Sequence, residues 1–99
     1  MKVRITEPAE KDLEKGTRFY ERQTPGLGEY FLDSLSADID SLAYFAGIHR
    51  TLFGCYRLLA KRFPFAIYYK IKNDEAIVLA VLDCRQNPAR IEKRLSGNS

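Results

Sequence analysis

Apolar positions in the first half of the chain recur at helical spacing. Val3 and Ile5 alternate with polar residues, which predicts a short, half-buried N-terminal strand. A helix begins near Pro8, since proline is tolerated in a first helical turn, and it ends before Pro25. Its apolar face consists of Ala9, Leu13, Thr17 and Tyr20. A second helix, from Leu27 to Ala43, completes a predicted antiparallel helical hairpin, with a stripe of Leu27, Phe31, Leu35, Ile39 and Leu42.

The second half alternates at the period of a β-strand. Cys55 to Lys61 and Phe65 to Ile71 each have one apolar face, and Pro64, which cannot donate to a sheet, lies in the connection between them. Asn73-Asp74 supplies turn chemistry for a second hairpin. Ala76 to Leu82 is nearly continuous in apolar residues, which predicts a strand buried on both faces.

The C-terminal segment from Ala89 to Leu95 is predicted to form a short helix or tail, and Ser96 to Ser99 a flexible end. The order β-α-α-β-β-β describes an α+β domain in which the helical hairpin packs on one face of a mostly antiparallel sheet. Its last three strands form an antiparallel meander, and the other sheet face is partly open. With 99 residues we expect one domain, 1–99, that buries a modest share of its surface.

Charge is distributed unevenly along the chain. Residues 1–40 carry six basic and nine acidic side chains, whereas Ser41 to Asn73 carries six basic side chains and no acidic one. A positive segment beside an acidic front half attracts nucleic acid or an acidic protein, or it is a solvated basic face with no ligand. Charge alone favours the solvated face.

Several classes of protein do not fit this sequence. The N-terminus lacks the apolar region of a signal peptide, and no apolar run approaches the ~20 residues that span a bilayer, so we expect a cytoplasmic protein without a membrane partner. Cys55 and Cys84 are expected to be reduced and packed. His49 has no nearby cysteine or second histidine, so we read it as a surface or turn residue and expect neither a metal nor a cofactor.

The chain resembles bacterial toxins of the RelE/ParE superfamily, often called plasmid-stabilisation proteins, from type II toxin–antitoxin systems. The match covers nearly the whole chain and rests on the joint order of short segments: Ala9, Asp12-Leu13, Tyr20-Glu21, Gly26-Leu27-Gly28, Phe31, Tyr56-Arg57, Lys61-Arg62-Phe63-Pro64-Phe65, Tyr68-Tyr69, Ala80-Val81-Leu82-Asp83-Cys84-Arg85 and Pro88. The resemblance implies a small growth-inhibiting toxin that a cognate antitoxin wraps around and neutralises.

Two mechanisms occur among such toxins. RelE-like members are metal-independent ribonucleases that cleave mRNA in the ribosome, and ParE-like members bind and poison DNA gyrase. RNA cleavage needs a proton acceptor, a proton donor and a positive clamp on the phosphate. Arg85 fits the arginine that ends the last strand in RelE-like enzymes, but Ala66 stands where their mid-strand arginine is expected, and no tyrosine or histidine follows Arg85.

The residues therefore favour a ParE-like toxin that binds a protein rather than an enzyme. A RelE-like mRNA endonuclease remains the alternative, as does a non-toxic protein of this fold that binds only its antitoxin. Candidates for contacting the target or a nucleic acid are Arg57, Lys61, Arg62, Tyr68 and Arg85. Arg57 and Lys61 share a strand face by their spacing, and this face is either functional or merely solvated. Tyr69 belongs to the core by parity with Ile67, which leaves Tyr68 exposed or under a partner.

Overall fold

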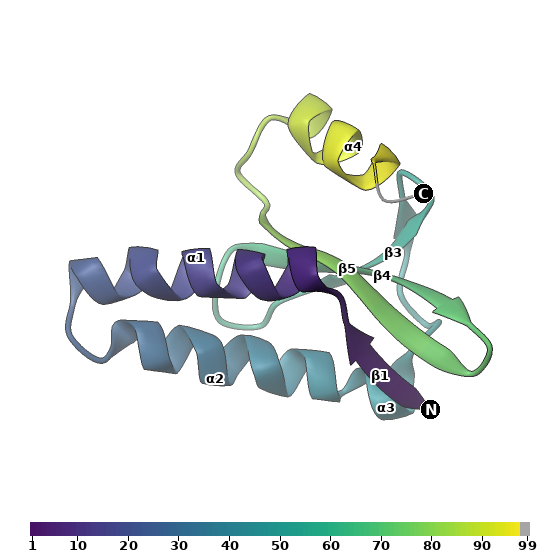
Figure 1. Ribbon diagram of the computed structural model, residues 1–99, viewed down its shortest axis with the longest axis horizontal. Helices are drawn as coiled ribbons and strands as arrows, with labels where there is room; N and C mark the ends of the chain where they lie inside the picture. Colours follow the sequence, from purple (N-terminus) through teal and green to yellow (C-terminus); the bar gives the residue numbers. More distant parts are fainter. Residues whose placement is uncertain (98–99) are drawn as a thin grey trace.

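The computed structural model describes residues 1–97 of the chain. Within them the elements form a strand, a helical region, four further strands and a C-terminal helix (Figure 1). In chain order these are β1 (Lys2–Ile5), α1 (Glu7–Gln23), α2 (Leu27–Asp40), α3 (Leu42–Phe45), β2 (Thr51–Leu52), β3 (Cys55–Leu59), β4 (Phe65–Lys72), β5 (Glu75–Asp83) and α4 (Pro88–Ser96). The α+β class and the helical hairpin expected from the sequence are confirmed. Ser96, expected in the flexible end, is the last residue of α4, and residues 98 and 99 of that end lie outside the described residues.

The strands form one mixed sheet in the order β1-β5-β4-β3-β2. β1 runs parallel to β5, and every other neighbouring pair is antiparallel. Two-residue turns close the β4–β5 hairpin at Asn73-Asp74 and the β2–β3 hairpin at Phe53-Gly54. All four of these residues have positive φ, which is the conformation that tight hairpins require. Asparagine, aspartate and glycine tolerate this conformation, so the expected turn at Asn73-Asp74 is confirmed.

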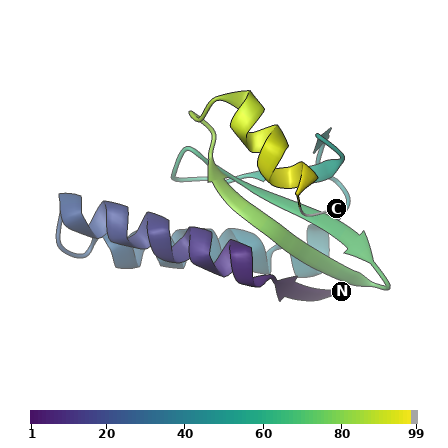
Figure 2. The same cartoon turned by 45° about the horizontal axis from the view of Figure 1, so that its top comes forward.

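Helices lie on both faces of the sheet. The α1–α2 hairpin covers one face, and α4 lies on the other, which we call the second face (Figure 2). The main core lies under the hairpin and includes Phe31, Leu35, Ile67 and Tyr69. A smaller buried cluster lies between the second face and α4, and it consists of Cys55, Ala66, Tyr68, Ala80, Leu82, Ile91 and Leu95. The predicted helical alternative for the C-terminal segment is therefore correct, and this helix covers part of the face that was expected to be partly open.

Close contact between α1 and α2 depends on a small residue. A Cβ atom built on Gly16 would lie 2.6 Å from the ring of Phe31. That ring belongs to an aromatic cluster with Tyr20, Phe63 and Phe65, whose centroids lie 4.9 to 5.1 Å from it. Aromatic pairs at such distances contribute about 0.5–1.5 kcal/mol beyond burial. The hairpin is thus fixed to the sheet at its turn end by a rigid set of rings.

Two element ends differ from the sequence-based expectation by more than one residue. The second helix ends at Asp40 and is followed by the single turn α3, and the two-residue strand β2 was not predicted. β3 ends at Leu59 instead of Lys61, because the carboxylate of Asp38 in α2 accepts the backbone N–H of Lys61 at 3.1 Å and draws the chain away from the sheet. No helix among residues 1–97 is both long enough and apolar enough to cross a membrane.

Candidate functional site

The predicted site residues lie in three separate places. Arg57 and Tyr68 are opposite one another on β3 and β4. Lys61 and Arg62 lie in the loop between these strands, and Arg85 follows the end of β5. Lys61 is therefore not on the strand face of Arg57, contrary to the spacing argument. Whether any of these residues contacts a target stays a prediction.

Tyr68 is buried within the chain itself. Only 1% of its surface is exposed, because Ile91 and Leu95 of α4 pack in the same cluster. Burial raises the pKa of the Tyr68 hydroxyl, an effect that the nearby Arg57 guanidinium partly opposes. The expectation of an exposed Tyr68 is wrong for the free chain, and its ring is not available to stack on a base. Cys55 lies in the same cluster, and both cysteines are free thiols, as expected.

Arg57 is half-buried beside Tyr68 rather than fully solvated. Its Nε atom is buried and has no hydrogen-bond partner in the described structure. A buried, unpaired donor carries a desolvation cost of about 1–3 kcal/mol or more for a charged group. Arg57 is therefore a charged side chain held at the margin of the second cluster, and the purely solvated interpretation does not describe it.

Arg85 is bound to its neighbour Asp83. Its Nε and Nη2 atoms donate to the two carboxylate oxygens at 2.9 and 2.7 Å, and its backbone N–H donates to Oδ1 at 2.8 Å. These hydrogen bonds lower the pKa of Asp83, and the carboxylate raises the pKa of Arg85. β5 ends at Asp83, so Arg85 does follow the last strand as the resemblance implies. Its charge is largely compensated there.

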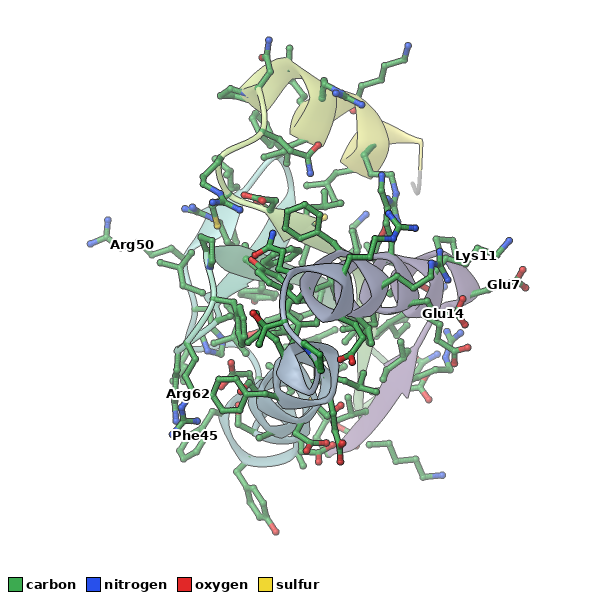
Figure 3. The ribbon with its side chains drawn as sticks, turned by 90° about the vertical axis from the view of Figure 1, so that its left-hand side faces the viewer. Glu7, Lys11, Glu14, Phe45, Arg50 and Arg62 are labelled. Carbon is green, nitrogen blue, oxygen red and sulfur yellow. The ribbon has the colours of Figure 1, made fainter. Side chains whose placement is uncertain are left out.

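Lys61 and Arg62 lie in the loop between β3 and β4, and the loop passes the C-terminal end of α2. Asp38, which accepts the Lys61 N–H, is only 5% exposed. Figure 3 shows Arg62 and Phe45 projecting from one side of the molecule, opposite Glu7 and Lys11 on α1. The loop is anchored to α2, and its arginine is exposed.

Sequence reasoning did not find the groove between α1, the end of β5 and α4. We call it the α4 groove; it has a volume of about 450 Å³. Its apolar lining consists of Phe19, Phe65, Val81 and Leu82. Its cationic side chains are Lys15 and Arg90, together with Arg94. An apolar lining beside cations suits an amphipathic segment of a protein that carries acidic side chains.

Both carboxylates of the α4 groove are already engaged. Asp12 accepts from Nη1 and Nη2 of Arg94 at 2.9 and 2.8 Å, and its Oδ2 also accepts the Val81 N–H at 2.9 Å. Asp83 is paired with Arg85. Lys15 and Arg90 form no ion pair within residues 1–97, so the groove presents net positive charge to an incoming segment.

The carboxylate of Asp12 satisfies a backbone N–H of β5 that no neighbouring strand reaches. β1 ends at Ile5, which pairs with Val78, so β5 beyond this point is paired with β4 on one side and has no strand on the side of β1. Thr6 Oγ1 donates to the Val78 carbonyl at 2.7 Å, and Asp12 accepts from Val81, so side chains near the start of α1 satisfy the exposed backbone. Asp12 thereby joins α1, β5 and α4 at one point.

His49 does not form a metal or acid–base site with another histidine or cysteine. Its Nδ1 atom contacts the Tyr69 hydroxyl, which also accepts the Gly47 N–H at 2.9 Å. Burial lowers the pKa of His49 and raises that of Tyr69. No cluster of three or more metal-ligating side chains occurs in the part of the chain that the structure describes.

Comparison with known proteins identifies one family model that matches most of the chain. Residues 3–88 match the family model described as the ParE toxin of the type II toxin–antitoxin system parDE. Among solved structures, a chain of the chromosomal ParDE TA system from P. aeruginosa is similar, with 22% sequence identity and a TM-score of 0.75. The similarity covers 82% of this chain and 92% of that chain, and it supports the fold. No similar sequence was found among curated proteins.

Proposed function

The chain belongs to the ParE toxin family of type II toxin–antitoxin systems, and from this premise we propose that it inhibits growth by binding a protein target. The target is DNA gyrase, an assignment that comes from the family resemblance and not from any residue of the α4 groove. A cognate antitoxin neutralises the toxin. The observation that supports a protein-binding mechanism is the α4 groove. Its apolar lining, together with Lys15 and Arg90, which form no ion pair within residues 1–97, fits a protein segment.

The antitoxin segment that we propose for this groove is amphipathic and acidic. Phe19 is 49% exposed and offers an uncovered ring at the edge of the groove. Exposed aromatic side chains beside arginine are typical anchors of protein interfaces. Lys15 and Arg90 supply charge from α1 and α4, so a bound segment would contact both helices.

Metal-independent RNA cleavage has less support from the same geometry. Ala66, at the position of the expected arginine, is fully buried in the second cluster. Arg57 and Arg85 lie on different parts of the sheet, and Arg85 is paired with Asp83. The carboxylate of Asp83 raises the pKa of Arg85 further, away from the neutral range that efficient proton transfer favours.

A thermal melt with the product of the adjacent gene tests the antitoxin claim. A ligand that binds only the folded state raises the melting temperature. We expect the rise for the wild-type chain and its near loss for Lys15→Glu combined with Arg90→Glu. The matched control is Lys11→Glu with Lys93→Glu, which changes charge equally on the same two helices outside the groove.

The outcomes separate the two parts of the proposal. If the melting temperature of the wild-type chain does not rise, the adjacent-gene product is not its partner. If the melting temperature rises equally for the groove variant and the wild-type chain, the product binds the toxin but does not bind it in the α4 groove. A loss for the control variant as well would show that bulk charge, not the groove, governs binding.

A further inference from the structure

The second face carries basic side chains on three strands away from α4. Val3 and Ile5 pack in the main core, so the alternating residues Lys2 and Arg4 project from the opposite face. The strand register aligns them with β5 and β4 in two cross-strand rows: Lys2, Glu75 and Lys72 in one, and Arg4, Ile77 and Lys70 in the other. We call Lys2, Arg4, Lys70 and Lys72 the basic rows.

This part of the second face is open. α4 packs over the cluster of Ala66, Tyr68 and Leu82, near the other end of the strands. The turn of the β4–β5 hairpin extends beyond the end of α4 in both views (Figures 1 and 2). Lys2, Arg4 and Lys72 are exposed and Lys70 is half-buried, so the cations are available to a partner.

Charge on the basic rows is not balanced within the chain. Their single carboxylate, Glu75, is bound to Arg4, with 3.1 Å between Oε1 and Nε. Lys2, Lys70 and Lys72 form no ion pair among residues 1–97. Arg57, on β3 next to β4, extends the positive charge across the same face.

The dimensions suit a regularly charged polyanion. Neighbouring strands are about 4.8 Å apart, and residues two apart on one strand about 6.7 Å, so the four cations mark a rectangle of roughly 10 by 7 Å. Neither row contains an aromatic residue on which an unpaired base would stack. Phosphate contacts without stacking are typical of sequence-independent binding to a duplex.

We propose that the basic rows bind the phosphate backbone of duplex DNA without reading its sequence. This inference goes beyond the proposed function and does not depend on it, since the α4 groove and the basic rows share no residue. The toxin thus has two separate surfaces: a groove for a protein segment and a flat cationic face for a duplex.

The test is the salt dependence of binding to a labelled mixed-sequence DNA duplex, followed by fluorescence anisotropy with the purified chain. Four phosphate contacts predict that log K falls with log salt with a slope of about −3 to −4. Lys70→Ala combined with Lys72→Ala should weaken binding and reduce the slope by about two. Lys11→Ala with Lys93→Ala, which removes the same charge from the helices, should leave the slope unchanged.

Four results would overturn the proposal: no binding at low salt, an equal loss in the control variant, tighter binding to single-stranded RNA of the same sequence, or equal binding to poly-L-glutamate. The RNA result would favour a ribonuclease surface, and the polyglutamate result an acidic protein partner. Binding of the adjacent-gene product by the Lys70→Ala/Lys72→Ala variant, measured in parallel, keeps failure of this proposal distinct from failure of the proposed function.

Discussion

Arg94 in the last helix forms a two-point ion pair with Asp12 in the first helix, 82 residues earlier in the chain. The pair is partly buried, with side-chain exposures of 31% and 13%. Asp12 also accepts the Val81 N–H. One carboxylate therefore holds α4 against α1 and satisfies a backbone donor on the edge of β5 that β1 does not reach. Asp12 therefore shapes the α4 groove by joining α4 to α1 and to β5.

Replacing Asp12 by alanine should lower the free energy of unfolding by about 2–3 kcal/mol, because Val81 loses its acceptor and Arg94 a charged partner. Urea unfolding at neutral pH measures the change. Lys11→Ala is the control on the same helix, where the exposed pair with Glu7 contributes at most about 1 kcal/mol. Equal effects of the two substitutions would contradict the structural role of Asp12. Hydrogen exchange of α4 amides should also speed up in Asp12→Ala.

Gly16→Ala should destabilise the chain by about 1–3 kcal/mol, although alanine is the better helix former by about 1 kcal/mol. The new methyl group would lie 2.6 Å from the Phe31 ring, which its aromatic neighbours hold in place. Gly97→Ala is the control, since its nearest atoms would lie at an ordinary 3.6 Å. A stabilised Gly16→Ala variant in urea unfolding would show that Phe31 can move aside.

The helical hairpin and the residues of the main core could be predicted from the sequence alone. The stripes containing Leu13, Tyr20 and Phe31 are buried as predicted, and so is Tyr69. Helical spacing and strand alternation are local properties, and they identify a buried face without knowledge of what covers it. The turn at Asn73-Asp74 was predictable for the same reason.

The burial of Tyr68 and the presence of the α4 groove could not be predicted from the sequence, because both depend on contacts between residues far apart in the chain. Alternation places Tyr68 on the second face, but only the packing of Ile91 and Leu95 decides that this part of the face is covered. Asp12 is one of the residues that carry the family resemblance, but the sequence did not indicate its role, because its partners Val81 and Arg94 lie 69 and 82 residues away. The one available signal was the spacing of Arg90 and Arg94 on a short helix with Ile91 and Leu95 on its apolar side.

Tyr68→Ala should reduce stability by about 3–5 kcal/mol, as for other large aromatic side chains removed from a core. Tyr68→Phe keeps the ring and serves as the control. Thermal melts and growth inhibition should decline together in Tyr68→Ala, because the side chain acts through folding. A Tyr68→Ala variant that keeps its melting temperature and loses toxicity would instead place Tyr68 in the target interface.

Arg85→Ala should raise the pKa of Asp83 toward the ordinary aspartate value of about 3.9, because the hydrogen bonds from Arg85 keep it low. A depressed pKa in the folded state means that this pair stabilises the fold above the ordinary pKa and ceases to do so as the pH falls through the folded-state pKa. NMR titration of the Asp83 carboxyl group measures the shift. Arg62→Ala, remote from Asp83, is the control, and an equal pKa in both variants would exclude the pairing.

Protein binding, and not RNA cleavage, is the mechanism proposed for this ParE-family toxin. Its most direct test is induction of the chain in bacteria without its antitoxin, with protein synthesis, mRNA integrity and the DNA-damage response followed from the first minutes. We expect filamentation and induction of the DNA-damage response while translation continues on intact mRNA. Rapid loss of translation with cleaved mRNA would contradict it, and unimpaired growth would show that the chain is not toxic.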